Sequence, residues 1–129
     1  MRKLLVRSAD QEAEQSAAMS KRRIAVDFDG VIHAYTKGWQ DGSIYDEPVE
    51  GAIEALLKLS ERFEVYIFTT RVKDLEQADM IRQWLIKHGW PHVEKPFPEI
   101  TNIKQPATAY IDDRAIRFTN WADVRKYFD

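Results

Sequence analysis

Three short apolar runs, each followed at once by polar residues, limit what this chain can fold into. The runs lie at residues 24–28, 64–70 and 107–111, and segments with helical spacing of apolar side chains separate them. Short runs of this kind are typical of strands buried in a parallel sheet, and strand–helix alternation favours helices packed on that sheet. The sequence therefore predicts an α/β fold, a three-layer sandwich around a mainly parallel, Rossmann-like sheet.

Periodic apolar side chains and end signals such as Pro48 and Gly89 predict the other elements. These are a helix over 48–62, a helix over 75–88, a weak strand over 92–94 and a closing helix over 120–127. Residues 1–20 differ in composition from the rest and are predicted to be an N-terminal extension. Residues 21–129 are predicted to form a single domain, in which Trp84, Trp90 and Trp121 serve as core or edge packing.

The residue counts exclude several classes of protein. The chain has no cysteine, which excludes a disulfide scaffold, a thiolate zinc site and a cysteine nucleophile, and fits a reducing compartment. Its 19 basic and 21 acidic residues give a net charge of −2, so no overall field attracts a membrane or nucleic acid. No apolar run approaches the roughly 18 residues that cross a membrane. A cytoplasmic protein with no membrane partner is expected, and its oligomeric state is left open.

Acidic residues stand at the ends of two of the predicted strands. The first run ends in Asp27 and Asp29, and the last is followed by Asp112 and Asp113. The carboxyl ends of parallel strands meet at one edge of a sheet, so the four carboxylates are expected to converge. Two unit charges about 4 Å apart repel by roughly 4 kcal/mol at an effective dielectric constant near 20. A bound cation is therefore expected, and an oxygen-only ligand set favours Mg²⁺.

Four elements follow one another along the chain: the segments IAVDFDGVIH and IFTTR, then Lys104, then the segment AYIDD. In this order they resemble the four motifs of the haloacid dehalogenase superfamily of phosphohydrolases. The resemblance implies a fold of haloacid dehalogenase type and a Mg²⁺-dependent phosphomonoester hydrolase that forms an aspartyl-phosphate. It implies that Asp27 is the nucleophile and Asp29 the general acid and base. Thr69 would bind a phosphoryl oxygen, and Lys104 would balance the negative charge of the site.

The same resemblance implies a ligand set for the metal and a set of substrate contacts. Mg²⁺ would be bound by Asp27, Asp112 and the backbone carbonyl of Asp29, with Asp113 in support. Residues beside the motifs are expected to contact substrate, namely Gly30, Thr70, Arg71 and Arg114. For the two arginines, a salt bridge to Asp113 or to a helix acid fits equally well.

The spacing of the motifs leaves no room for a cap domain. Between the first two motifs only residues 31–48 lie outside the predicted helix and strand, and they predict a small β-hairpin flap that turns at Asp41 and Gly42. An open site suits a phosphorylated small molecule or nucleotide, or nucleic acid only at a phosphorylated end. Tyr35, Trp39 and Tyr45 could stack on a base, although packing of the flap explains these aromatic residues at least as well.

Two alternatives without phosphatase activity are considered. One is a catalytically silent binding or regulatory module of the same fold, although such a protein would usually have lost a catalytic carboxylate. The other is a receiver-type phosphoacceptor domain, in which the acid pair follows the first strand, whereas here Asp112 and Asp113 come last. His33 follows the first motif closely and could face either the site or only the flap, and the flap is favoured.

Overall fold

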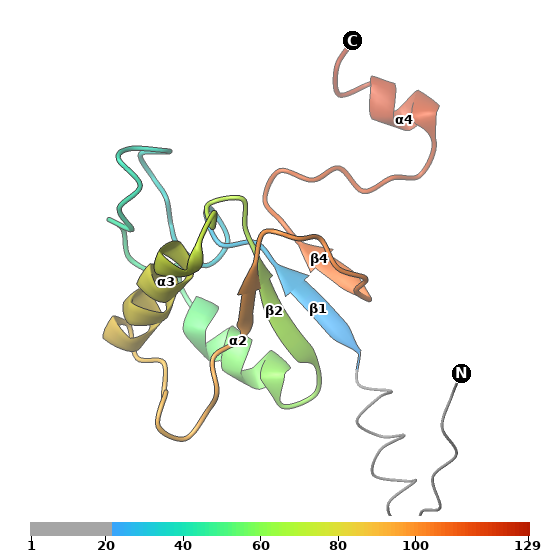
Figure 1. The fold of residues 1–129 in the computed structure, drawn as a ribbon. Coiled ribbons are helices and arrows are strands. Elements are labelled where there is room, and N and C mark those ends of the chain that lie inside the picture. The colour runs from blue at the N-terminus through green and yellow to red at the C-terminus, as the bar shows by residue number, and fades with distance from the viewer. Residues whose placement is uncertain (1–21) are drawn as a thin grey trace, which may run out of the picture.

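The computed structural model describes residues 22–129, which form a four-stranded parallel sheet with helices against it (Figure 1). The strands are β1 (Arg23–Val26), β2 (Glu64–Phe68), β3 (Glu99–Thr101) and β4 (Ala109–Ile111). The helices are α2 (Ala52–Ser60), α3 (Leu75–Lys87) and α4 (Trp121–Arg125). The strand order is β3-β2-β1-β4, and every neighbouring pair is parallel. The predicted α/β class with a parallel sheet is confirmed, and the extension predicted at residues 1–20 lies outside the described residues.

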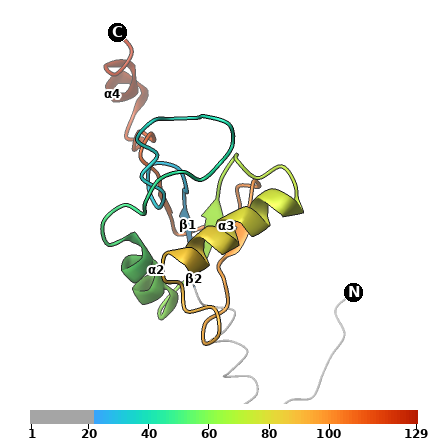
Figure 2. The ribbon, with the colours of Figure 1, turned by 90° about the vertical axis from the view of Figure 1, so that its left-hand side faces the viewer.

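Helices α2 and α3 cover one face of the sheet (Figure 2). Alternate residues of the central strands point to this face, and those of β1 are Ile24 and Val26. They pack against Leu56 of α2 and Ile81 and Leu85 of α3, all of them buried. Burying each such side chain stabilises the fold by roughly 1.5–3 kcal/mol, so this layer holds the two helices against the sheet.

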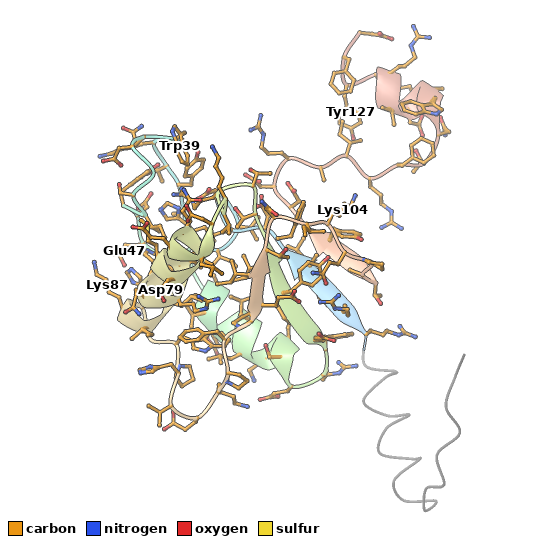
Figure 3. All side chains as sticks on the ribbon, viewed as in Figure 1. Trp39, Glu47, Asp79, Lys87, Lys104 and Tyr127 are labelled. Atoms are coloured by element: carbon orange, nitrogen blue, oxygen red, sulfur yellow. The ribbon has the colours of Figure 1, made fainter. Side chains whose placement is uncertain are left out.

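The opposite face of the sheet is covered by side chains and a loop. Tyr66 is fully buried there. The guanidinium of Arg23 lies over the Tyr66 ring, and the Tyr66 hydroxyl donates to the carbonyl of Gln105. Helix α4 stands away from the sheet, and Tyr127 beside it is exposed (Figures 1 and 3). The packing role predicted for Trp121 is wrong, since its side chain is 71% exposed. Within residues 22–129, no helix has the length and apolar character required to span a bilayer.

Two predicted elements differ from the structure, and one strand was not predicted. The helix predicted from Pro48 begins only at Ala52, because Gly51 has a φ of 80° and interrupts the helical backbone. Residues 92–94 form a turn, in which the Glu94 amide donates to the carbonyl of Pro91. Strand β3 follows instead and pairs with β2. Trp84 and Trp90 are buried, as predicted.

Residues 31–48 form a loop without regular strands, and the predicted β-hairpin is present only as one antiparallel bridge at the base, between His33 and Pro48. There the Ala34 amide donates to the Glu47 carbonyl at 2.9 Å. Beyond this bridge, side chains satisfy backbone groups that a hairpin would pair across its two strands. The Thr36 amide donates to the Asp46 carboxylate at 2.9 Å, and the Lys37 amide donates to the Tyr45 hydroxyl at 2.8 Å. This segment is called loop 31–48 below.

Candidate functional site

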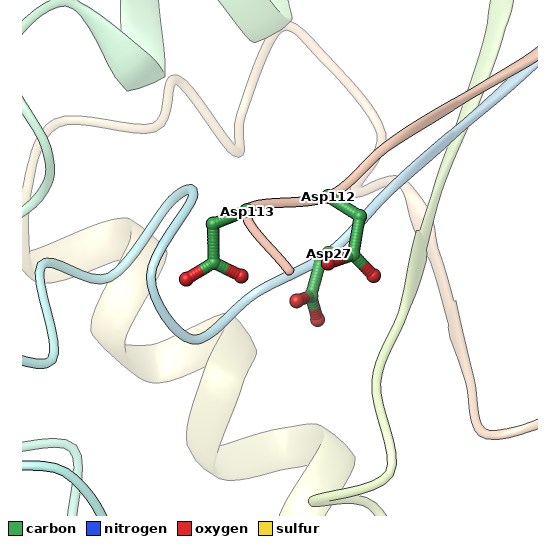
Figure 4. A group of neighbouring side chains, drawn as sticks. All are labelled: Asp27, Asp112 and Asp113. Carbon is green, nitrogen blue, oxygen red and sulfur yellow. The ribbon is translucent and has the colours of Figure 1, made fainter. Parts of the chain in front are cut away.

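Three carboxyl groups gather where β1 and β4 end. The strands are parallel neighbours with Val26 opposite Ile111, so the next residues, Asp27 and Asp112, must lie side by side. The Asp27 amide extends the pairing by donating to the Ile111 carbonyl at 2.9 Å. One oxygen each of Asp27, Asp112 and Asp113 lies within 4.8 Å of the others (Figure 4). These three residues are called the carboxylate triad.

The environment of Asp27 disfavours its charged form. The pKa of its carboxyl is raised from 3.8 to about 6, mainly by burial and also by the charges of Asp112, Asp113 and Asp29. The Phe28 amide donates to Asp27 Oδ1 at 2.8 Å and opposes this effect. The triad therefore carries negative charge that its own hydrogen bonds do not balance, which a cation would relieve.

The donors of the triad suit a hard divalent cation. All three are carboxylates, which hard cations prefer. The triad contains no thiolate and no imidazole, the ligands that softer metal ions prefer. Asp112 and Asp113 are exposed and Asp27 is partly buried, so the site is open to solvent on one side. This arrangement fits Mg²⁺, which keeps several of its water ligands in protein sites.

Gly30 is required where the chain turns after β1. Its φ of 86° lies in the region that L side chains rarely adopt. A Cβ atom at this position would stand 2.2 Å from Oδ2 of Asp113. Glycine therefore allows the turn and the close approach of Asp113, which is a structural role beside the substrate contact predicted for Gly30.

The side chain of Asp29 is not a member of the triad, and it binds two buried groups instead. Arg71 donates from Nε to Oδ2 at 3.0 Å and from Nη2 to Oδ1 at 2.9 Å. His33 Nδ1 lies 2.8 Å from Oδ1. The predicted metal contact of Asp29 involves its backbone carbonyl and stays a prediction.

Arg71 makes hydrogen bonds to protein groups through all three of its guanidinium nitrogens, and its predicted substrate contact stays a prediction. Its third hydrogen bond runs from Nη1 to the carbonyl of Gly42 in loop 31–48, at 2.8 Å. The residue is 7% exposed, and the ring of Trp39 lies 5.1 Å from the guanidinium carbon. Arg71 does form a salt bridge, but its partner is Asp29 and not Asp113 or a helix acid, the partners considered from the sequence.

Thr69 and Thr70 follow β2 and occupy different environments. Thr69 is buried, and its hydroxyl oxygen accepts from the Arg71 amide at 3.2 Å. This contact uses a lone pair of the hydroxyl and not its proton, so the donor function expected toward a phosphoryl oxygen is retained. Thr70 is exposed. Its predicted substrate contact stays a prediction.

Lys104 and Arg114 lie on the solvent side of the triad. Lys104 Nζ stands 4.7 Å from the ring centre of Tyr110, and Lys104 shares a cavity of about 470 Å³ with Asp27 and Asp112. Figure 3 shows Lys104 beside β4. The Arg114 side chain is exposed, and its amide donates to Asp112 Oδ1 at 2.7 Å. The structure thus brings Lys104 to the same cavity as the nucleophile candidate.

His33 belongs to loop 31–48 and contacts both that loop and Asp29. The contact with the flap, which the sequence favoured, is made with the Asp46 amide, and the less favoured orientation toward the site is also present, since Nδ1 lies beside Asp29. Its position four residues after Asp29 is the only signal in the sequence that could have indicated this contact. The aromatic residues of loop 31–48 lie in different environments. Tyr45 packs within the loop, where its hydroxyl donates to the carbonyl of Gly38, whereas Trp39 is 58% exposed.

We compared the chain with protein-family models, with curated proteins and with solved structures, and none of the three comparisons gave a significant match.

Proposed function

We propose that this protein is a Mg²⁺-dependent phosphomonoester hydrolase that acts through an aspartyl-phosphate on Asp27. The observation that carries the proposal is the carboxylate triad, in which a partly buried acid with a raised pKa stands beside Asp112 and Asp113. A perturbed carboxylate in an open cavity is typical of functional sites. The matching fold would be a three-layer sandwich of haloacid dehalogenase type without a cap domain. The parallel sheet with its acidic carboxyl edge supports this fold.

The triad and Asp29 divide the proposed chemistry between them. Asp27, Asp112 and Asp113 would hold the metal, which when bound would neutralise negative charge and polarise the phosphoryl oxygens. Asp27 Oδ1 accepts from the Phe28 amide, so Oδ2 is the oxygen left to attack phosphorus. With a pKa of about 6, Asp27 is mostly ionised at neutral pH and can act as a nucleophile.

The reaction would proceed in two steps. In the first, an Asp27 oxygen forms a bond to phosphorus as the bond to the leaving oxygen breaks, and Asp29 gives that oxygen a proton. In the second, water attacks the same phosphorus, Asp29 takes a proton from the water, and the Asp27 carboxylate is released. Inorganic phosphate and an alcohol are the products.

Two further residues would stabilise the charge on the transferring group. The Thr69 hydroxyl can donate to a phosphoryl oxygen from the end of β2. The Lys104 ammonium can approach the phosphoryl group through the cavity that it shares with Asp27. Its side chain is exposed, and within residues 22–129 it forms no salt bridge. Removing one such donor typically lowers kcat by about 100- to 1,000-fold.

The surroundings support a small substrate with a hydrophobic or aromatic group. Trp39 and Arg71 line a second cavity of about 380 Å³ between loop 31–48 and the start of α3. Trp39 is the aromatic residue of the loop that remains exposed for stacking. A phosphorylated small molecule, a nucleotide or a phosphorylated nucleic-acid end are the classes proposed.

Hydrolysis of an aryl phosphate tests the proposal. We expect turnover with Mg²⁺, loss of turnover with EDTA, and loss again in Asp27→Asn with the fold intact. Asp79→Asn is the matched control, since Asp79 is an exposed acid on α3 away from the triad. Metal-independent turnover or an active Asp27→Asn protein contradicts the mechanism. Binding of Mg²⁺ without turnover of any phosphometabolite, mononucleotide or phosphorylated oligonucleotide would instead favour a silent binding module.

A further inference from the structure

A fully buried histidine connects Asp29, the proposed general acid and base, to Asp46 near the end of loop 31–48. His33 is 0% exposed, and both of its ring nitrogens are engaged. Nδ1 lies 2.8 Å from Oδ1 of Asp29, and the backbone amide of Asp46 donates to Nε2 at 3.0 Å. The ring thus bridges the carboxylate and the far end of the loop.

The second of these bonds assigns the tautomer of His33. A backbone N–H can only donate, so the Nε2 atom that accepts from Asp46 carries no proton. The single ring proton of the neutral imidazole is then on Nδ1, where it is donated to Asp29. Fixing one imidazole nitrogen through a bond to the other is a general way of setting a tautomer.

Aromatic packing prevents the ring from turning. The ring of Phe28 stacks on His33 at 5.5 Å, and the rings of Tyr45 and Trp84 meet it edge-on at 5.2 Å and 5.7 Å. Trp84 is itself held, because its Nε1 donates to the carbonyl of Asp46 at 3.0 Å. A donor held this firmly loses little conformational entropy when it binds the carboxylate.

The hydrogen bonds to Asp29 leave one oxygen with a vacant position. A carboxylate offers about four lone-pair sites in all. Oδ1 accepts from His33 and from Arg71 Nη2, whereas Oδ2 accepts only from Arg71 Nε. The vacant lone pair of Asp29 is therefore on Oδ2.

We propose that His33 is a positioning residue, which with Arg71 holds Asp29 so that Oδ2 is the atom that exchanges the proton. The inference rests on the proposed phosphatase function and adds an atom to it. The proton leaves Oδ2 for the leaving oxygen as the P–O bond breaks, and Oδ2 later receives a proton from the attacking water. His33 Nδ1 keeps its own proton throughout.

The test uses two substrates that differ in their need for a proton. An alkyl phosphate loses an alkoxide, which requires protonation, whereas 4-nitrophenyl phosphate loses a stable phenolate, which does not. The constant kcat/KM reports steps up to departure of the leaving group, so hydrolysis of the aspartyl-phosphate does not affect it. A defect in the position of Asp29 should lower kcat/KM for the alkyl phosphate alone.

Two variants of His33 separate its two hydrogen bonds. His33→Asn keeps an N–H near the Nδ1 position, toward Asp29, whereas His33→Gln keeps an acceptor near the Nε2 position, toward Asp46. We expect His33→Gln to lower kcat/KM for the alkyl phosphate by about 100-fold, the effect of a roughly 1 Å misplacement. His33→Asn should recover much of that loss. His88→Gln is the control, because His88 also lies against Trp84 but touches Glu47 rather than Asp29.

Each outcome decides the proposal. Equal losses on both substrates, or a His33→Asn protein worse than His33→Gln, would show that His33 only supports the loop. A wild-type protein that hydrolyses neither substrate refutes the phosphatase function and this inference with it. Nitrogen-15 NMR of the histidine ring in the wild-type protein gives a readout without any variant or activity. A proton on Nε2 at neutral pH would overturn the assignment, and a proton on Nδ1 alone supports it.

Discussion

Replacing Asp27 by asparagine should stabilise the metal-free protein while it removes the proposed nucleophile. The pKa of Asp27 is about 6 in the folded protein and 3.8 in the unfolded chain, so the folded state binds the proton more tightly. The contribution of Asp27 to stability is therefore neutral below pH 3.8 and becomes unfavourable as the pH rises through 6. Asparagine has nearly the same shape, and its Oδ1 can still accept from the Phe28 amide.

The size of the effect follows from the pKa difference. At about 1.4 kcal/mol per pH unit, the rise from 3.8 to about 6 corresponds to about 3 kcal/mol. Asp27 is only partly buried and solvent screens its charge, so we expect Asp27→Asn to gain about 1–3 kcal/mol at pH 8. For a domain of this size each kcal/mol raises Tm by roughly 4 °C.

Thermal unfolding followed by circular dichroism in EDTA measures this gain. The Tm of Asp27→Asn should exceed that of the wild type at pH 8, and the difference should shrink at pH 4. Asp46→Asn is the matched control of opposite sign, because hydrogen bonds from Thr36 and Glu47 lower the pKa of Asp46 to about 2. That variant should lose stability at neutral pH. An Asp27→Asn protein with no gain at pH 8, or with the same gain at pH 4, would refute the electrostatic account.

Three other predictions follow from the site. Mg²⁺ at about 100 times its Kd should stabilise the wild type by about 2.7 kcal/mol, and thermal unfolding with and without EDTA should show that Asp112→Asn and Asp113→Asn reduce this gain. Gly30→Ala should cost more than about 1 kcal/mol in chemical denaturation, because alanine is strained at a φ of 86° and its Cβ meets Asp113; unchanged stability would contradict the close approach. Lys104→Ala should lower kcat by about 100-fold with little change in Tm, since the side chain is exposed; a fall in Tm without a fall in kcat would make its role structural.

The sheet could be predicted because the signal for it is local. The apolar runs around Ile24, Tyr66 and Tyr110 correspond to β1, β2 and β4, and their parallel arrangement follows from the alternation with helices. Strand β3 was missed because Glu99–Thr101 is short, lies at the edge of the sheet, and has only one aliphatic residue. Its identity depends on pairing with β2, which no local pattern encodes.

The site could be predicted in part, for a related reason. The meeting of Asp27 with Asp112 follows from the rule that parallel strands end at one edge, so residue order alone indicated it. The bonds from Arg71 and His33 to Asp29 did not follow, because they depend on how side chains turn inside loop 31–48. The hairpin predicted in the same segment is limited to the bridge between His33 and Pro48, since beyond that bridge side chains such as Asp46 and Tyr45 satisfy backbone amides.

The strand order also decides when the carboxylate triad can form. β1 is the first strand of the described chain and β4 the last, yet they are neighbours in the sheet. Pairing between segments so distant in sequence carries a large loop-closure cost and tends to form late in folding. We therefore expect Asp27 to be in place before Asp112 and Asp113 arrive, so that their mutual repulsion acts on the final docking of β4. Capture of the proposed divalent cation and completion of the sheet would then be one event, and the ion would accelerate the last stage of refolding and leave earlier stages unchanged.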